Sequence, residues 1–178
     1  MNKFITSGFF VIILFLNFCK VSSQVVFTES TGVVAIEAEN FFSQTKDDIR
    51  KWVIRTGDSK GHSADIAKTA SNGAFIEVTP DTRITHDDKL IKGENFSNVA
   101  GEMTIVSYKI NVVTPGRYYV WVRSYSAGSE DNGVHVGLDG IWPESGQRMQ
   151  WCEGKNVWTW ASKQRTEKNH CGEEKLIF

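Results

Sequence analysis

The chain has 178 residues, 40% of them hydrophobic, which fits one ordinary domain with a single core and argues against intrinsic disorder. Its 20 Lys and Arg nearly balance 21 Asp and Glu, which argues against a broad nucleic-acid-binding surface, because phosphate neutralisation needs a basic excess. Six Trp, 11 Phe and only three Pro favour a compact, aromatic-rich β domain over a helical bundle or a large multi-domain enzyme.

Residues 1–23 are predicted to be a secretory signal peptide. A positively charged start precedes the apolar run Phe9–Leu16, which is about half of the ~20 residues needed to cross a bilayer. Short side chains then lead to a predicted cleavage site between Ser23 and Gln24. A membrane anchor is the alternative. We therefore expect residues 24–178 to form one secreted, periplasmic or cell-surface domain with no membrane span after cleavage.

Short apolar or alternating runs, bounded by turn residues, predict a series of strands. In chain order they are Val33–Ile36, Ala74–Val78, Met103–Val113, Tyr118–Tyr125, Val134–Leu138, Met149–Cys152, Val157–Trp160 and Leu176–Phe178. The turn at Thr114–Gly116 predicts a hairpin between the third and fourth runs. Only Ser63–Ala70 has a helical pattern.

Strands at this spacing without intervening helices predict an all-β fold, an antiparallel β-sandwich or jelly roll. The run Leu176–Phe178 reads as the start of a strand with no polar tail after it. An unpaired edge strand of this kind is a liability. We therefore expect a domain that lacks its last strand or strands, and further domains in the full-length protein.

Two cysteines remain after removal of the signal peptide. Cys152 and Cys171 are expected to pair in an oxidising compartment, and closing this loop is worth about 3 kcal/mol. A zinc site is the alternative, but only His170 adjoins either cysteine. The sequence favours the disulfide.

Four of the six Trp fall within residues 142–160. Sugar rings stack their C–H faces on aromatic rings, and their hydroxyls need fixed polar partners, so such a cluster favours a polysaccharide-binding surface. Core packing is the alternative for any single Trp, and Trp121, in the middle of a predicted strand, is expected to be buried. The predicted stacking residues are Tyr125, Trp142, Trp158 and Trp160, and the predicted hydrogen-bonding residues are Asp131, Asn132 and Arg148.

Three segments in fixed order resemble carbohydrate-binding modules of families 6 and 35. They are Ile36–Glu39 (IEAE), Gly116–Arg123 (GRYYVWVR) and Asp131–Gly140 (DNGVHVGLDG). The resemblance covers about residues 33–178 and implies a galactose-binding-like β-jelly-roll with a structural Ca²⁺. By the same resemblance, Glu37 and Glu39 are the expected calcium-binding acids, and Ca²⁺ does favour carboxylate oxygens.

Catalysis is the competing function. Gly57–Gly61 (GDSKG) matches the G-x-S-x-G nucleophile pattern, but no D-x-x-H pair follows, and the later chain lacks the alternating strands and helices of such hydrolases. A Gly-rich turn around Ser59 is the simpler interpretation. No spacing singles out a pair of carboxylates for glycoside cleavage.

The sequence thus predicts a non-catalytic module that binds a polysaccharide and targets an attached enzyme, such as a glycoside hydrolase, or a surface protein to it. An adhesion or assembly module that binds protein is the alternative. A small secreted esterase or glycoside hydrolase is the third hypothesis.

Overall fold

The computed structural model describes residues 25–169 and 171–174. The predicted signal peptide, His170 and the predicted strand Leu176–Phe178 lie outside the described residues. One α-helix, α1 (His62–Ala67), and three 3₁₀ helices, η1 (Ala38–Asn40), η2 (Ser71–Gly73) and η3 (Glu144–Gly146), accompany the strands. The strands are β1 (Val26–Thr28), β2 (Ser43–Thr45), β3 (Lys51–Thr56), β4 (Ala74–Thr79), β5 (Ile105–Ser107), β6 (Lys109–Asn111), β7 (Val122–Tyr125), β8 (Gly133–Val134), β9 (Met149–Gln150), β10 (Trp158–Ala161), β11 (Lys163–Gln164) and β12 (Glu173–Glu174).

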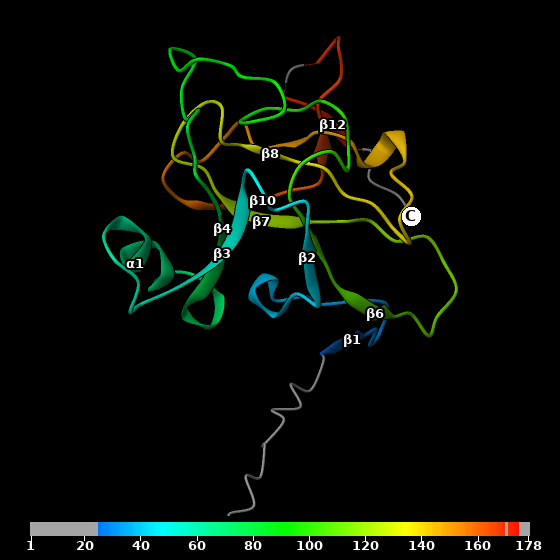
Figure 1. The fold of residues 1–178 in the computed structure, drawn as a ribbon. Helices are drawn as coiled ribbons and strands as arrows, with labels where there is room; N and C mark the ends of the chain where they lie inside the picture. Colours follow the sequence, from blue (N-terminus) through cyan, green and yellow to red (C-terminus); the bar gives the residue numbers. More distant parts are fainter. Residues whose placement is uncertain (1–24, 170, 175–178) are drawn as a thin grey trace, which may run out of the picture.

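The described strands form five small sheets rather than two large ones. Four are two-stranded: β1–β6, β2–β5, β3–β4 and β7–β10. The fifth has four strands in the order β12–β11–β9–β8. Every pair is antiparallel except β1–β6. In Figure 1, β1 and β6 lie at the lower end of the molecule, α1 lies beside β3 and β4, and β8 and β12 lie at the upper end. The fold is therefore all-β with little helix.

The β3–β4 pair is the longest ladder, and its sequence explains it. Both strands are rich in aromatic and β-branched residues, which favour extended backbone, and Ile54 is paired with Ile76. On the opposite face Arg55 Nε donates to Glu77 Oε2 at 2.6 Å, which closes the pair with a salt bridge. The turn after β3 and helix α1 connect the two strands, and the predicted strand and helix here are confirmed.

Two sequence predictions about strands are wrong, the hairpin at Thr114–Gly116 and the strand at Val33–Ile36. The run Met103–Val113 does not form a hairpin with Tyr118–Tyr125, because β5 pairs with β2, β6 with β1, and β7 with β10. The run is also interrupted at Tyr108, whose hydroxyl donates to Ala38 O at 2.9 Å. Val33–Ile36 is not a strand: only Val33 makes an isolated bridge, to Ser30. These elements depend on pairing between strands that lie far apart in the sequence. The alternation of apolar and polar residues along a single run cannot reveal that pairing.

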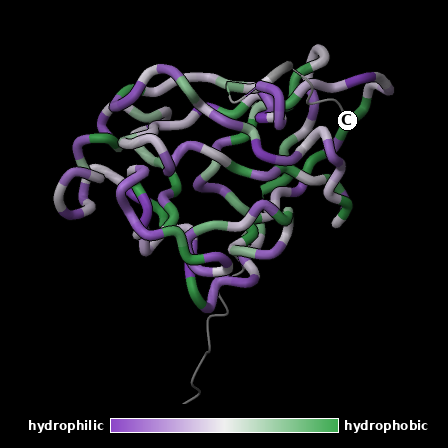
Figure 2. Tube along the Cα trace, turned by 90° about the horizontal axis from the view of Figure 1, so that it is seen from above, coloured by the Kyte–Doolittle hydropathy of each residue, from purple (hydrophilic) through white to green (hydrophobic). Residues whose placement is uncertain are grey.

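The best-packed part of the described chain surrounds Trp151. Met149, Trp151 and Ala161 are buried and pack against Val120, Val122, Val134 and Val136. The Trp151 indole donates through Nε1 to Val122 O at 3.3 Å, which ties β7 to the segment after β9. Figure 2 shows short hydrophobic stretches interleaved with hydrophilic ones along the whole trace. Many large apolar side chains stay exposed, among them Val33, Val113 and Ile141, so this core uses only a small share of them.

Candidate functional site

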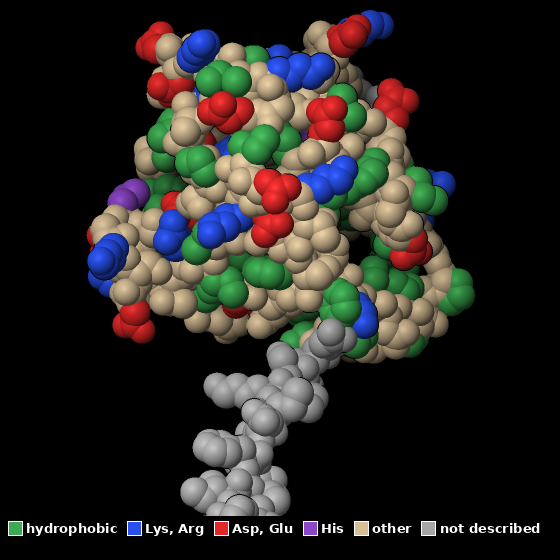
Figure 3. Space-filling view, in the orientation of Figure 1, with side chains coloured by type: hydrophobic (Ala, Val, Ile, Leu, Met, Phe, Trp, Pro, Cys, Tyr) green, Lys and Arg blue, Asp and Glu red, His purple; other side chains and the backbone are tan. Residues whose placement is uncertain are grey.

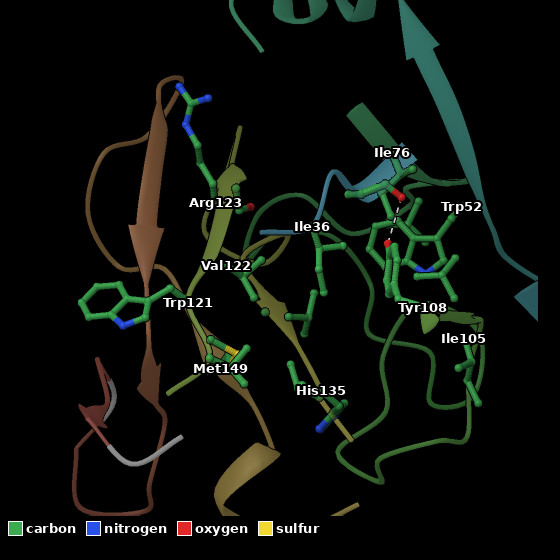
Figure 4. A pocket seen from close by; sticks show the side chains of 18 of the residues that line it. Ile36, Trp52, Ile76, Ile105, Tyr108, Trp121, Val122, Arg123, His135 and Met149 are labelled. Atoms are coloured by element: carbon green, nitrogen blue, oxygen red, sulfur yellow. Dashed lines mark hydrogen bonds between the residues drawn. The ribbon is translucent and has the colours of Figure 1, made fainter. Parts of the chain in front are cut away.

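The two-stranded β7–β10 sheet presents an aromatic face. Its antiparallel register places Trp158 opposite Tyr125 and Trp160 opposite Arg123. Directly paired residues, and residues two apart on one strand, share a face, so these four side chains lie on the same side. Val122 and Ala161 lie on the other side, in the core around Trp151. Figure 4 shows Trp121 directed away from Val122, so it lies on the aromatic side as well. We call Trp121, Arg123, Tyr125, Trp158 and Trp160 the aromatic shelf.

Neighbouring groups fix one end of the shelf. The Trp158 ring lies edge-on to Tyr125, with centroids 5.7 Å apart, and to Phe75 of β4, with centroids 5.6 Å apart. Its Nε1 donates to Thr69 Oγ1 at 3.1 Å. The Arg123 guanidinium carbon lies 5.3 Å from the Trp158 ring centroid, within cation–π range. Trp158 is therefore held in one orientation before any ligand binds.

The other end of the shelf is open to solvent. Trp160 is 62% exposed and Trp121 is 55% exposed. The prediction that Trp121 is buried is therefore wrong. The alternation of residues around Trp121 does not show which face of β7 packs against the core. Only the pairing of β7 with β10 shows it. Trp151 is buried at 3% exposure and takes no part in the shelf. Large exposed aromatic side chains that adjoin one another are typical of binding surfaces.

Asp131 and Asn132 lie close to the core rather than on the shelf. The Asp131 carboxylate accepts hydrogen bonds from Ser126 Oγ at 3.1 Å and from the backbone N–H groups of Ala127 and Gly128, each at 2.8 Å. Asn132 is buried, and its Nδ2 donates to Trp151 O at 2.9 Å. These contacts shape the loop that follows Tyr125, and a direct role in sugar binding stays a prediction.

Trp142 and Arg148 are engaged in packing contacts of their own. The Trp142 indole lies against Gly101 and Gly137, where an added Cβ would approach the ring to 2.5 and 2.8 Å. Arg148 donates its backbone N–H to His135 Nδ1 at 3.1 Å, and its guanidinium carbon lies 5.9 Å from the Phe96 ring centroid. The structure thus brings together three of the seven predicted carbohydrate-binding residues, Tyr125, Trp158 and Trp160, and it adds Trp121 and Arg123.

The two predicted calcium ligands lie at the 3₁₀ helix η1, not on a strand. Glu37 Oε1 accepts a hydrogen bond from Ser71 Oγ at 2.8 Å, and Glu39 lies within η1. Within residues 25–169 and 171–174, no three His, Cys, Asp or Glu side chains form a group that could hold a metal ion. Because Ca²⁺ takes six to eight oxygen ligands, two carboxylates do not make its site, and a calcium role for them stays a prediction.

Cys152 and Cys171 are present as thiols whose side chains interact. Burial, together with the hydrogen bond and the charge of Cys171, raises the pKa of the Cys152 thiol to about 11. The sulfhydryl of Cys152 is therefore protonated at neutral pH, which makes it a poor nucleophile in the reduced protein. The disulfide stays a prediction, and the proximity of the two side chains is compatible with it.

Ser59 lies in the turn that leads from β3 to α1. Its Oγ accepts a hydrogen bond from Thr56 N at 2.9 Å, and its own N–H donates to Thr56 O at 3.0 Å. Both contacts are those of a side chain that closes a tight turn. Among the described residues, no helix is long and apolar enough to cross a membrane.

Fold and site together define a strand-built protein with an exposed aromatic shelf on one two-stranded sheet. The chain matches no family model and no solved structure. It is similar to the uncharacterized protein P23 of Formosa agariphila, with 54% identity over 168 residues. The match covers 92% of this chain and 41% of that protein, so the chain spans less than half the length of the relative it matches.

Proposed function

We propose that the chain is a non-catalytic polysaccharide-binding module of an exported protein, and that the aromatic shelf is its binding surface. The observation that carries the proposal is the pair of Trp side chains, Trp121 and Trp160, that stand more than half exposed beside Trp158. Burying so much indole surface in the interior would stabilise the fold, so its exposure favours an external ligand.

The composition of the shelf suits an extended glycan. Flat indole rings offer stacking surfaces, and the Arg123 guanidinium, which lies over the Trp158 ring, supplies hydrogen-bond donors. Trp158 is held by its ring contacts, so little side-chain entropy is lost when a sugar stacks there. The shelf lies along two strands, and it therefore fits several consecutive sugar units rather than a single buried one.

The proposal extends to the whole protein. The module would target an attached enzyme, such as a glycoside hydrolase, or a surface protein to its glycan, and its fold would be a jelly roll of the type of carbohydrate-binding module families 6 and 35. A structural Ca²⁺ belongs to this proposal only as an expectation, which melting curves with added Ca²⁺ and with EDTA would test. No binding step depends on it.

Affinity electrophoresis against a panel of polysaccharides tests the proposal. We expect at least one polysaccharide to retard the protein, and Trp160→Ala or Trp121→Ala to weaken that binding roughly tenfold, or about 1.4 kcal/mol, through lost stacking. Phe42→Ala is the matched control, because Phe42 is 37% exposed, precedes β2 and packs on Lys109. Retardation by none of the polysaccharides, or unchanged binding by the two Trp variants, would overturn the proposal.

An adhesion or assembly module is the second candidate, because exposed Trp is also enriched at protein interfaces. The same variants distinguish the two functions. A shelf that binds protein would leave the electrophoretic mobility in polysaccharide gels unchanged.

A further inference from the structure

Two arginines face each other at the ends of β9 and β11. Gln164 of β11 is paired with Met149 of β9. Arg165 therefore stands opposite Arg148 at the next position, and its N–H donates to the Arg148 carbonyl oxygen at 2.9 Å. Both arginines are partly buried. Because like charges directly opposite each other destabilise a strand pair, this arrangement does not serve the stability of the sheet.

Among the described residues, no acidic side chain pairs with either arginine. Neither guanidinium group forms a salt bridge or donates a hydrogen bond within that part of the chain. Burial lowers the pKa of Arg148, the charge of Arg165 lowers it further, and the charge of Glu130 only partly offsets them. The carboxylate oxygens of Glu130 already contact Arg83 Nη1 and His86 Nδ1. The two facing guanidinium groups therefore carry positive charge that these residues leave unpaired.

The backbone holds Arg148 in an unfavourable conformation. Its φ is 54°, in the left-handed region that residues other than glycine rarely adopt. Its N–H donates to His135 Nδ1 at 3.1 Å, and its carbonyl accepts from Arg165, so the conformation is fixed on both sides. Strained residues of this kind cluster at functional sites. Two local rules are thus broken at one position, and such exceptions are expected where a side chain serves function rather than folding.

The arginine pair and the aromatic shelf line the same wide hollow. Its volume is about 2400 Å³, well above the roughly 300–1,000 Å³ of pockets for small ligands. An extended ligand on the shelf therefore has room to reach the arginines. Figure 3 shows Lys and Arg side chains interspersed with Asp and Glu on the face in view, and the formal net charge of the chain is −1. A polyanion is not attracted by the surface in general, so the arginine pair is a local site.

We propose that Arg148 and Arg165 bind an oxyanion group of the glycan, either the carboxylate of a uronic acid or a sulfate ester, so that the module selects acidic polysaccharides. This inference rests on the proposed glycan binding by the shelf. A guanidinium group donates two parallel hydrogen bonds that match two oxygens of such an anion. The bound charge would also remove the repulsion between the two arginines. Stacking on indole rings does not require a charged sugar, so the pair supplies a selectivity that the aromatic rings lack.

Affinity electrophoresis of the full chain against matched acidic and neutral polysaccharides tests the proposal. The pairs are polygalacturonate with its methyl ester, and a sulfated galactan with its desulfated form, which distinguishes a carboxylate from a sulfate. We expect one acidic polymer to bind about tenfold more tightly than its neutral partner. Arg148→Gln and Arg165→Gln should each remove most of that preference. The matched control is Arg117→Gln, which removes the same charge from an exposed position outside the hollow and should keep the preference.

The outcomes distinguish this inference from the proposed function. Equal binding of acidic and neutral forms, or an unchanged preference in Arg165→Gln, would overturn the inference and leave glycan binding by the shelf intact. Binding of no polysaccharide at all would overturn both. Trp160→Ala should weaken the binding of acidic and neutral forms alike, because stacking does not depend on the charge of the sugar.

Thermal melts give a second readout and keep the test decisive if the Arg148 variant does not fold. Arg165→Gln removes one of two facing charges and breaks no side-chain hydrogen bond among the described residues. We therefore expect its melting temperature without ligand to be no lower than that of the parent protein. A saturating acidic polysaccharide should raise the melting temperature of the parent more than that of Arg165→Gln. A clear loss of stability in the ligand-free variant would assign the pair a structural role and overturn the proposal.

Discussion

Asp131 shows how a side chain that suits sugar binding is used to build a loop. Its carboxylate accepts three hydrogen bonds, from Ser126, Ala127 and Gly128. Asp131→Ala leaves the two backbone N–H groups without these partners, so we expect it to lower the free energy of unfolding by about 1–3 kcal/mol. Urea denaturation measures the loss.

The same substitution separates a structural role from a binding role. Glycan affinity, measured where both proteins are folded, should stay within a factor of about two in Asp131→Ala. Asp131→Asn, which keeps one acceptor oxygen, should lose less stability than Asp131→Ala. A large loss of affinity without a loss of stability would show instead that the carboxylate contacts the sugar.

His135 makes stability depend on pH. Its Nδ1 accepts from Arg148 N at 3.1 Å, so the proton resides on Nε2, which donates to Ser97 O at 3.2 Å. Burial lowers the pKa of His135, and the charge of Arg148 lowers it further, against the Ser97 bond that raises it. Protonation would place a second donor against the Arg148 N–H, so the folded state favours the neutral ring.

The sign of the pH effect follows from this lowered pKa. Near pH 6.5, the ordinary value, the unfolded chain takes up a proton that the folded protein does not, so stability is lost as pH falls from 7.5 toward 5.5. The His135→Gln variant should show a weaker dependence on pH over that range, by urea midpoints at the two pH values. An equal dependence in both proteins would assign the effect to other groups.

At the scale of elements, one turn positions Trp142. Leu138 and Ile141 exchange backbone hydrogen bonds of 2.9 Å, and Gly137 precedes them. A Cβ at Gly137 would stand 2.7 Å from Ile141 O and 2.8 Å from the Trp142 ring. Gly137→Ala should therefore cost about 1–3 kcal/mol, because neither the turn nor the indole can move freely.

The control for this prediction lies in the turn after β3. A Cβ at Gly57 would meet no atom within 4 Å, so Gly57→Ala should change stability by no more than about 0.5 kcal/mol. Thermal melts of the two variants beside the parent protein give the comparison. Equal melting temperatures for the two variants would contradict the close packing around Trp142.

Elements with a strong local pattern were predictable, and elements that depend on distant partners were not. Ala74–Val78 lies within β4 (Ala74–Thr79), as its short run of mainly apolar residues before Pro80 predicts, and His62–Ala67 forms the helix expected at Ser63–Ala70. The aromatic shelf was predictable only in part. Trp158 and Trp160 share a face by simple spacing, whereas the exposure of Trp121 depends on the pairing of β7 with β10, which lie far apart in the sequence.

For the whole molecule, the exposure of the Trp side chains differs widely, and this difference is measurable. Trp160 and Trp121 are 62% and 55% exposed, whereas Trp151 is 3% exposed and lies in the core. Acrylamide should therefore quench part of the fluorescence readily and leave another part nearly unquenched. Trp160→Ala should reduce the readily quenched fraction, and the Phe42→Ala control should leave it unchanged.

A bound polysaccharide should protect the same fraction. Sugar rings stacked on Trp121 and Trp160 exclude the quencher from those indoles but do not affect Trp151 on the opposite face of β7. We therefore expect a saturating ligand to lower the quenching constant of the accessible class alone, and Trp160→Ala to show a smaller protection. A ligand that binds without changing acrylamide access would have to bind away from the aromatic shelf.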